Sequence, residues 1–333
     1  MGKTTGIAWT DHTFNPWWGC TKVSPGCDHC YAETWAKRVG MQIWGVDTRR
    51  RVFEHKHWAE PLRWNRLAGA RGVRERVFCA SMADVFENHP ALPEERDKLW
   101  TLIHKTPHLD WQLLTKRIGN VARMVPPSWM SGHWPAHVQL GISVVNQEEL
   151  DRDAPKLLGM PAQTRFLSCE PLLGPLEFSR LPFRDGDARH SQNALTGETR
   201  LYCTGIDGNP DVHVKTEPVM PRLAWVIVGG ESGGKARGFR VQWARDIVRQ
   251  CKESGVPVFV KQMGAYVIDR NDAGFDGCEP WEWPEGTDDR LEHEIHGYVE
   301  RHQGADVRVR LADRAGADPA EWPEDLRVRE FPA

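Results

Sequence analysis

The chain has 333 residues, of which 40% are hydrophobic and 27% charged, and its formal net charge is −3. This length suits one large domain or two small ones with an ample core. No window of the sequence approaches an apolar membrane span, and the first residues lack the apolar stretch of a signal peptide. We therefore expect a cytoplasmic protein with reduced thiols and no membrane partner.

Three cysteines lie within eleven residues near the start of the chain, at Cys20, Cys27 and Cys30. Pro25 and Gly26 favour a turn between the first cysteine and the other two, so the three sulfurs can converge. A structural zinc ion normally takes four protein ligands, whereas an iron–sulfur cluster held by three cysteines keeps one iron open for another ligand. The spacing predicts a 4Fe-4S cluster; a zinc site completed by His29 or His12 is the alternative.

A basic segment follows the cysteines. Residues 49–76, which we call the basic segment 49–76, contain nine Arg or Lys and three Glu, whereas residues 282–333 contain fourteen Asp or Glu and seven Arg. Phe53, Trp58 and Trp64 interleave with the basic residues. Basic groups that follow phosphates, beside aromatic rings that stack on bases, are typical of nucleic-acid binding. We expect a nucleic-acid partner here; an amphipathic outer helix with solvated arginines would explain the same residues.

Short apolar runs then alternate with helical patterns. The runs are four to six residues long and apolar on both faces, as in the strands of a buried parallel sheet. They cover residues 76–81, 110–115, 138–143, 164–169, 224–229 and 257–261. Helices are predicted over residues 92–105, 147–158 and 242–254. Repeated strand–helix alternation predicts an α/β fold.

Polar residues follow nearly every predicted strand. They are Ser81 and Asp84, Lys116 and Arg117, Ser143 and Asn146, Cys169 and Glu170, Glu231, and Lys261 and Gln262. A doubly wound sheet binds its ligand at one switch point, whereas a (β/α) barrel gathers residues from the ends of many strands. The pattern therefore favours a barrel, and six or seven strands indicate a partial (β/α) barrel.

Two segments interrupt or follow the alternation. We expect the partial barrel over residues 1–264, with an insertion or lid at about 178–220, where Asp, Gly, Asn and Pro are frequent. Residues 265–333 are predicted to form a C-terminal appendage. Within it, the alternation over residues 307–311 is typical of a half-exposed strand.

Several stretches carry a specific resemblance. They are residues 6–11, 15–16, 19–27, 30–33, 81–86, 113–117, 141–144, 168–171 and 228–233. Together they resemble the radical S-adenosylmethionine (SAM) superfamily and, within it, a phage-associated three-cysteine-motif family of largely unassigned function. The cysteine spacing here is C-x6-C-x2-C, whereas the usual superfamily spacing is C-x3-C-x2-C, so the first loop is three residues longer.

The resemblance implies a partial barrel of the radical SAM type with two cofactors. A 4Fe-4S cluster on the three cysteines would bind the amino and carboxylate groups of SAM at its open iron. One electron from an external donor would then yield a 5′-deoxyadenosyl radical, and the protein would bind, orient and exclude water.

The same resemblance and the residue chemistry suggest roles for the polar strand ends. Ser81 and Asp84 are expected to bind the methionine ammonium, although both residue types also cap helices. Lys116 and Arg117 are candidates for the cofactor carboxylate or a substrate phosphate. Ser143 and Asn146 are candidates for the ribose, Glu170 for ribose or substrate, and Glu231 for the cofactor. Cys169 is a candidate to return a hydrogen atom to a substrate radical; a core thiol is the alternative.

We therefore predict a radical SAM enzyme that acts on a nucleic-acid base or nucleotide, in DNA repair or modification. The first alternative keeps this chemistry but gives it a small metabolite or peptide substrate. The second is a non-catalytic, zinc-stabilised nucleic-acid-binding module. We also predict that six of the polar residues face one cavity beside the cluster: Ser81, Asp84, Lys116, Ser143, Glu170 and Glu231.

Overall fold

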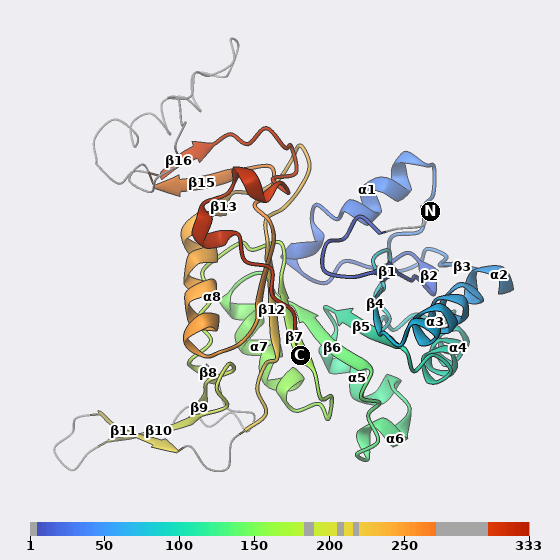
Figure 1. The fold of residues 1–333 in the computed structure, drawn as a ribbon, viewed down its shortest axis with the longest axis horizontal. Helices are drawn as coiled ribbons and strands as arrows, with labels where there is room; N and C mark the ends of the chain where they lie inside the picture. The colour runs from blue at the N-terminus through green and yellow to red at the C-terminus, as the bar shows by residue number, and fades with distance from the viewer. Residues whose placement is uncertain (1–4, 183–189, 205–209, 216–219, 271–305, 333) are drawn as a thin grey trace, which may run out of the picture.

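The computed structural model describes residues 5–182, 190–204, 210–215, 220–270 and 306–332. In this part of the chain a seven-stranded sheet has the order β1–β4–β5–β6–β7–β12–β14, and each neighbouring pair is parallel (Figure 1). Its strands are β1 (His12–Thr13), β4 (Glu75–Cys79), β5 (Leu109–Thr115), β6 (Val138–Ser143), β7 (Arg165–Cys169), β12 (Trp225–Gly229) and β14 (Val258–Gln262).

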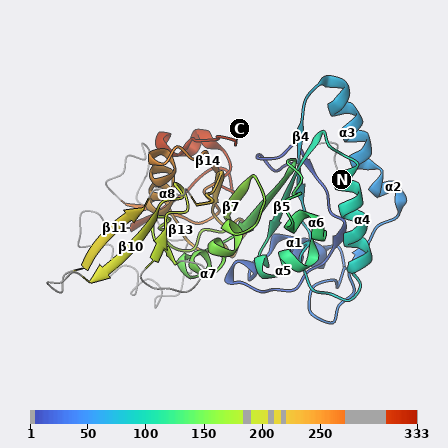
Figure 2. The same cartoon turned by 90° about the horizontal axis from the view of Figure 1, so that it is seen from below.

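Helices connect most of these strands. The helices are α1 (Tyr31–Arg38), α2 (His55–Trp58), α3 (Glu60–Arg71), α4 (Pro93–His104), α5 (Ile118–Met124), α6 (Pro127–Met130), α7 (Gln147–Leu158) and α8 (Val241–Glu253). A helix after β4, β5, β6 and β12 returns the chain to the start of the next parallel strand, as a parallel connection requires. Seen from below, α3 and α4 flank one end of the sheet and α8 flanks the other (Figure 2).

The predicted α/β fold with a partial (β/α) barrel is confirmed. All six predicted strands are present to within about two residues, and α4, α7 and α8 occupy the three predicted helical stretches. Sequence periodicity did not reveal β1, because a strand of two residues is too short to show alternation.

Residues alternate between the two faces of the curved sheet. In β7, Leu167 and Cys169 join the main core beneath the helices, whereas Phe166 belongs to a second cluster on the concave face. That second cluster consists of Trp9, Phe78, Phe166, Trp225, Ile227 and Phe259. The period of two that a strand imposes thus gives the barrel an apolar interior floor.

Three smaller sheets complete the described structure. Strands β2 (Trp17–Trp18) and β3 (Arg51–Val52) pair with each other. The four-stranded antiparallel sheet consists of β8 (Leu181–Pro182), β9 (His190–Gln192), β10 (Thr199–Thr204) and β11 (Pro210–Lys215). The third sheet contains β13 (Phe239–Arg240), β15 (Val267–Arg270) and β16 (Asp306–Val309). The predicted half-exposed strand at 307–311 is thus confirmed as β16, whereas the domain boundaries stay a prediction.

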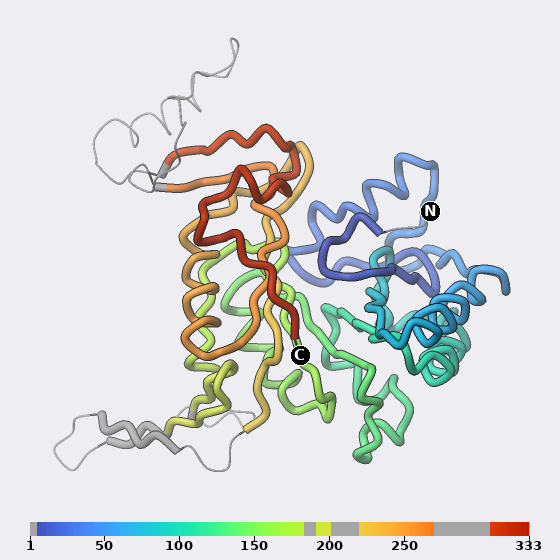
Figure 3. Tube along the Cα trace, viewed as in Figure 1, coloured from blue at the N-terminus to red at the C-terminus, as the bar shows by residue number. Residues whose placement is uncertain are grey.

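The last residues run back along the sheet. Val260 donates its backbone N–H to the carbonyl of Val328 at 2.9 Å, and Glu330 donates to Val258 at 3.0 Å, so this segment covers the edge of β14 (Figure 3). The guanidinium of Arg76, at the start of β4, lies 3.9 Å from the ring centre of Phe331. The C-terminal segment therefore contacts both sides of the open barrel. No described helix has both the length and the apolar composition needed to cross a membrane.

Candidate active site in the half-barrel

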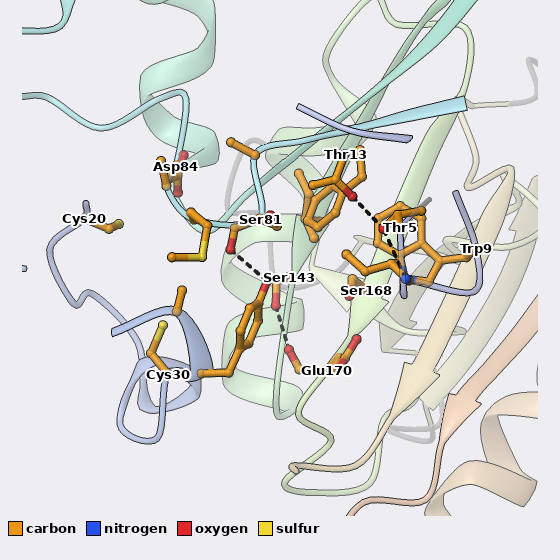
Figure 4. Close-up of a pocket in the computed structure, with 18 of the residues that line it drawn as sticks. Thr5, Trp9, Thr13, Cys20, Cys30, Ser81, Asp84, Ser143, Ser168 and Glu170 are labelled. Carbon is orange, nitrogen blue, oxygen red and sulfur yellow. Dashed lines mark hydrogen bonds between the residues drawn. The ribbon is translucent and has the colours of Figure 1, made fainter. Parts of the chain in front are cut away.

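A cavity of about 1120 Å³ extends from the carboxyl ends of the strands to Glu75 at the start of β4. Ten residues to which the sequence assigned a cluster, cofactor or substrate role line it: Cys20, Cys27, Cys30, Ser81, Asp84, Lys116, Arg117, Ser143, Glu170 and Glu231. In the view of Figure 4, Cys20 and Cys30 lie at one end, Thr5 and Thr13 at the other, and Ser81 between them. Residues far apart in the sequence reach one space because parallel strands end on the same edge of the sheet.

The loop that carries the cysteines, residues 19–30, is shaped by local interactions and is called the cysteine loop below. A single 3-10 turn, η1 (Pro25–Cys27), begins after Ser24, whose hydroxyl accepts the N–H of Gly26 at 3.0 Å. Gly19 has φ of 110°, and a Cβ there would lie 2.3 Å from the carbonyl oxygen of Ile43. Only glycine fits this position, which lies directly before Cys20.

The three cysteines are free thiols, but they do not form a closed metal-binding group. Among the described residues, no three His, Cys, Asp or Glu side chains are grouped so as to hold a metal ion. Burial raises the pKa of Cys20 to about 12 even though the guanidinium of Arg117 lies 3.5 Å from its sulfur. Burial also raises the pKa of Cys30. Both thiols therefore stay protonated at neutral pH unless a cation binds them.

The donor set of the cysteine loop fits an iron–sulfur cluster. Three soft thiol ligands match the requirement of a cluster that keeps one iron open. The zinc alternative would take its fourth ligand from His29 or His12. The Nδ1–H of His29 is donated to Glu231 at 3.0 Å, and the Nε2 of His12 is 3.0 Å from a carboxylate oxygen of Glu75. Each histidine uses only one ring nitrogen for its carboxylate partner, and the other nitrogen is left for a metal, as in histidines that ligate metal ions.

Asp84 lies at the cavity, but its carboxylate is already occupied. It accepts hydrogen bonds from the backbone N–H of Phe86 at 3.0 Å, the hydroxyl of Thr115 at 2.8 Å, and the backbone N–H of Lys116 at 3.1 Å. It also forms an ion pair with Arg117 at 2.8 Å. These donors use the lone pairs that a carboxylate offers. Asp84 therefore joins the ends of β4 and β5, and little capacity is left for the methionine ammonium.

Arg117 and Arg50 connect this network to the cysteine loop. Arg117 donates to the carbonyl of Thr21 and to the sulfur of Cys20. The side chain of Arg50 is 0% exposed and makes two hydrogen bonds to Glu87, each 2.8 Å long. It also donates to the hydroxyl of Thr21 at 3.0 Å. Arg50 belongs to the basic segment 49–76, but burial prevents the polyanion contact that we expected of that segment.

A second network crosses the cavity from β5 to β14. The ammonium of Lys116 donates to the hydroxyl of Ser143, which donates to the carbonyl of Glu170 at 3.0 Å. The carboxylate of Glu170 forms an ion pair with Lys261 and accepts from Gln262 at 3.4 Å. Within the described chain Lys116 has no carboxylate within ion-pair distance, so its charge is available to an anionic ligand.

Glu231 ties the end of β12 to the cysteine loop. It is 7% exposed and accepts from His29 at 3.0 Å, from the backbone of Arg237 at 2.9 Å and from the Arg237 side chain at 2.8 Å. Burial alone raises the pKa of Glu231, but the hydrogen bonds from Arg237 and His29 outweigh it, and the pKa ends below its usual value. The carboxylate is therefore ionised and positions the loop.

The structure does not bring Asn146 or Cys169 into the cavity lining. The side chain of Asn146 caps α7 by accepting the N–H of Glu149 at 3.0 Å. Cys169 is 0% exposed in the core beneath the helices, and burial raises its pKa. Its neighbour Ser168 lines the cavity instead, because adjacent strand residues point to opposite faces.

Sequence analysis missed Tyr31 as a cavity residue. Tyr31 donates its hydroxyl to the carbonyl of Ser81 at 2.7 Å, which ties α1 to the end of β4. The basic segment 49–76, which the sequence marks as a surface for a nucleic-acid partner, lines the same cavity with one face of α3, through Glu60, Arg63, Trp64, Leu67 and Arg71. These five residues are spaced as one face of a helix.

Two solved structures are similar in fold to this chain. One is a cysteine-to-serine mutant of spore photoproduct lyase, with 12% identity and a TM-score of 0.35 over 65% of this chain and 73% of that chain. The other is a double mutant of spore photoproduct lyase with bound AdoMet and dinucleoside spore photoproduct, with 11% identity and a TM-score of 0.38 over 75% of this chain and 76% of that chain. No curated protein matches the chain.

One family model matches nearly the whole length. It covers residues 4–317, which include the cysteine loop and all seven strands of the central sheet. The chain therefore belongs to the family described as "Protein of unknown function (DUF5131)".

Proposed function

We propose that this protein is a radical SAM enzyme that acts in the cytoplasm on a nucleic-acid base or nucleotide, in DNA repair or modification. One observation carries the proposal. Three thiols from a single loop line the same cavity as polar residues from the ends of β4, β5, β6, β7 and β12. A cluster on these thiols would face the ligand groups that the barrel collects. The phage association stays a prediction.

The chain offers suitable ligands for both cofactors. Cys20, Cys27 and Cys30 would hold a 4Fe-4S cluster, and Lys116 and Ser143 would meet the carboxylate or hydroxyl groups of SAM. When bound and reduced by an external electron donor, the cluster and SAM supply a 5′-deoxyadenosyl radical.

The remaining cavity residues hold and shield the ligands. Lys261 and Gln262 hold one oxygen of the Glu170 carboxylate, and the other oxygen is available to a ribose hydroxyl. Below these polar groups, the rings of Trp9 and Phe78 line the cavity and present an apolar surface to it. An apolar floor under fixed polar groups excludes water from reactive species.

The decisive experiment is anaerobic reconstitution of the full chain with iron and sulfide. We expect the visible absorbance of an iron–sulfur cluster and, after addition of SAM and a strong reductant, 5′-deoxyadenosine detected by chromatography. The matched control is the variant with Cys20, Cys27 and Cys30 all changed to Ala, which should bind neither iron nor sulfide. Purification of the wild type with tightly bound zinc and without 5′-deoxyadenosine formation would favour the zinc-stabilised module instead.

The substrate needs its own measurement. Binding to DNA should weaken as salt rises, because phosphate contacts release counterions, with a slope of roughly −0.9 per contact on duplex DNA in a log–log plot. If 5′-deoxyadenosine is formed but DNA does not bind at low salt, the small-metabolite or peptide alternative replaces the nucleic-acid substrate.

A further inference from the structure

One face of α3 forms a wall of the cavity that is remote from the cysteines. Trp64 stacks on His12, with ring centres 4.3 Å apart and planes at 2°. His12 precedes Thr13, which lies at the far end of the cavity from Cys20 and Cys30 in Figure 4. We call the cavity-lining residues of the helix the α3 wall: Glu60, Arg63, Trp64, Leu67 and Arg71.

Several basic side chains of the basic segment 49–76 are already paired with carboxylates, so only some of them can bind a ligand. Four of its arginines are paired with carboxylates: Arg50 with Glu87, Arg71 with Glu75, Arg74 with Asp110, and Arg76 with Asp11. Arg63 is exposed and lines the cavity, and its guanidinium has no ion pair or hydrogen bond within the described residues. Glu60 lies on the same wall but not within ion-pair distance of Arg63. The guanidinium of Arg63 is therefore free to bind an anion, in a two-pronged manner.

The rings beside Arg63 are held in place. His12 contacts Glu75 at 3.0 Å, and the other oxygen of that carboxylate pairs with Arg71. This chain of contacts fixes the His12 ring, and the stack then fixes Trp64. Leu67 adds an apolar side chain that is 43% exposed. Fixed aromatic rings next to a free guanidinium are the arrangement that binds a base together with its phosphate.

The cavity is somewhat larger than a common pocket for one ligand. Pockets for one drug-sized ligand commonly measure about 300–1,000 Å³. The volume here is about 1120 Å³, and the lining divides into a cysteine end and an α3 end. A cofactor at the cysteine end would leave the α3 end open to a second molecule.

We infer that the α3 wall is the substrate surface of the cavity and takes one nucleotide unit. The phosphate binds Arg63, and the base lies beside the stacked His12 and Trp64 rings and Leu67. This inference rests on the proposed function, because it assigns the substrate end of the same cavity. A nucleotide unit occurs both in a free nucleotide and in a strand, and the test separates these two sources.

The test compares two arginines of α3 that differ in position. Arg63→Gln removes a charge that lines the cavity, whereas Arg66→Gln removes an exposed charge that does not line it. Binding of fluorescein-labelled DNA, single-stranded and duplex, is measured by fluorescence anisotropy on the full chain over a salt series. Circular dichroism and a thermal melt check that both variants are folded.

We expect Arg63→Gln to weaken single-strand binding about tenfold at low salt, as the loss of one charge-assisted contact would. The slope of log affinity against log salt should become shallower by about 0.7, the value for one phosphate contact on a single strand. Arg66→Gln should change the affinity less than about twofold. Equal effects of the two variants, or no effect of either, would overturn the inference.

Competition with an unlabelled nucleoside monophosphate separates the sources. Displacement of the labelled strand from the wild type, but not from Arg63→Gln, shows that one free nucleotide satisfies the site. Displacement only by unlabelled strand shows that the α3 wall needs a polymer. Failure of the proposed function is a separate result, since it appears as absent 5′-deoxyadenosine in the reconstituted wild type, whatever the anisotropy shows.

Discussion

His29 and Glu231 lie 202 positions apart in the chain and are joined by a hydrogen bond of 3.0 Å between Nδ1 and Oε2. His29 lies between Cys27 and Cys30, and Glu231 follows β12. The contact therefore fastens the cysteine loop to the far side of the half-barrel. Arg237 reinforces it by bonding to Glu231 and to Asp28.

Glu231→Ala should loosen the cysteine loop. Because Glu231 is buried and accepts several charge-assisted hydrogen bonds, we expect the free energy of unfolding to fall by about 1–2 kcal/mol. We also expect several-fold less iron per chain after reconstitution. Glu231→Gln keeps an acceptor and should restore part of both losses. Glu253→Ala, at an exposed surface pair with Arg249, is the control. Iron content equal in Glu231→Ala and Glu253→Ala would show that the contact does not support the loop.

Arg50→Met should be among the most destabilising single changes near the site. It leaves the buried carboxylate of Glu87 without its partner, which costs about 3–5 kcal/mol in comparable cases. Urea denaturation of Arg50→Met and of its neighbour Arg49→Met measures the difference, and Arg49→Met should cost less than about 0.5 kcal/mol. The double variant Arg50→Met/Glu87→Leu should recover part of the loss. Similar midpoints for the two single variants would contradict this account.

Lys116→Gln should reduce the affinity for SAM without loss of the cluster. The change removes a cavity cation that has no carboxylate partner among the described residues, so it should weaken binding of an anionic group by about tenfold. Equilibrium dialysis of the reconstituted protein with labelled SAM measures this, alongside its iron content. Lys105→Gln, an exposed position outside the cavity lining, is the control. An unchanged affinity of Lys116→Gln for SAM would show that the carboxylate of SAM binds another residue.

Cys169→Ala should retain the iron–sulfur absorbance and the formation of 5′-deoxyadenosine. Its thiol is buried beneath the helices and does not line the cavity. The expected cost is about 1 kcal/mol of stability from lost packing. By contrast, Cys20→Ala should abolish the absorbance. If Cys169→Ala loses the cluster but keeps its fold, the Cys169 thiol has a role in the active site after all.

Glu75→Gln should lower stability in a manner that depends on pH. Burial alone raises the pKa of Glu75, but the hydrogen bonds from His12 and Arg71 outweigh it and hold the pKa below its usual value of 4.5. The ionised carboxylate thus contributes stability above about pH 4.5, and this contribution is lost as the pH falls through the lower folded-state pKa.

The free energy of unfolding of the wild type should therefore exceed that of Glu75→Gln by about 0.5–1 kcal/mol near neutral pH. This difference should shrink below pH 4.5. Thermal melts over a pH series give the comparison, with the exposed Glu94→Gln as reference. A difference that stays constant down to acid pH would mean that packing, not ionisation, explains the effect.

Local patterns in the sequence were sufficient for six strands of the central sheet, for α4, α7 and α8, and for the group of cysteines. Runs such as 110–115 are apolar on both faces, and buried parallel strands have that property wherever they lie. The turn at Pro25 and Gly26 and the strand-end positions of Lys116 and Ser143 are also local features. The partial barrel and most of the candidate cavity residues could therefore be predicted from the chain alone.

Tertiary structure decided which of those residues are free to act. Asp84 and Arg50 carry charges that the sequence presents as available, but partners from distant segments neutralise them, namely Arg117 and Glu87. Ser168 and Cys169 are neighbours in sequence, and only the direction of β7 decides which one faces the cavity. Charge pairing and side-chain direction depend on contacts between segments far apart in the chain. A pattern within one segment of the sequence cannot predict charge pairing or side-chain direction, because it does not specify which distant segment will pack against it.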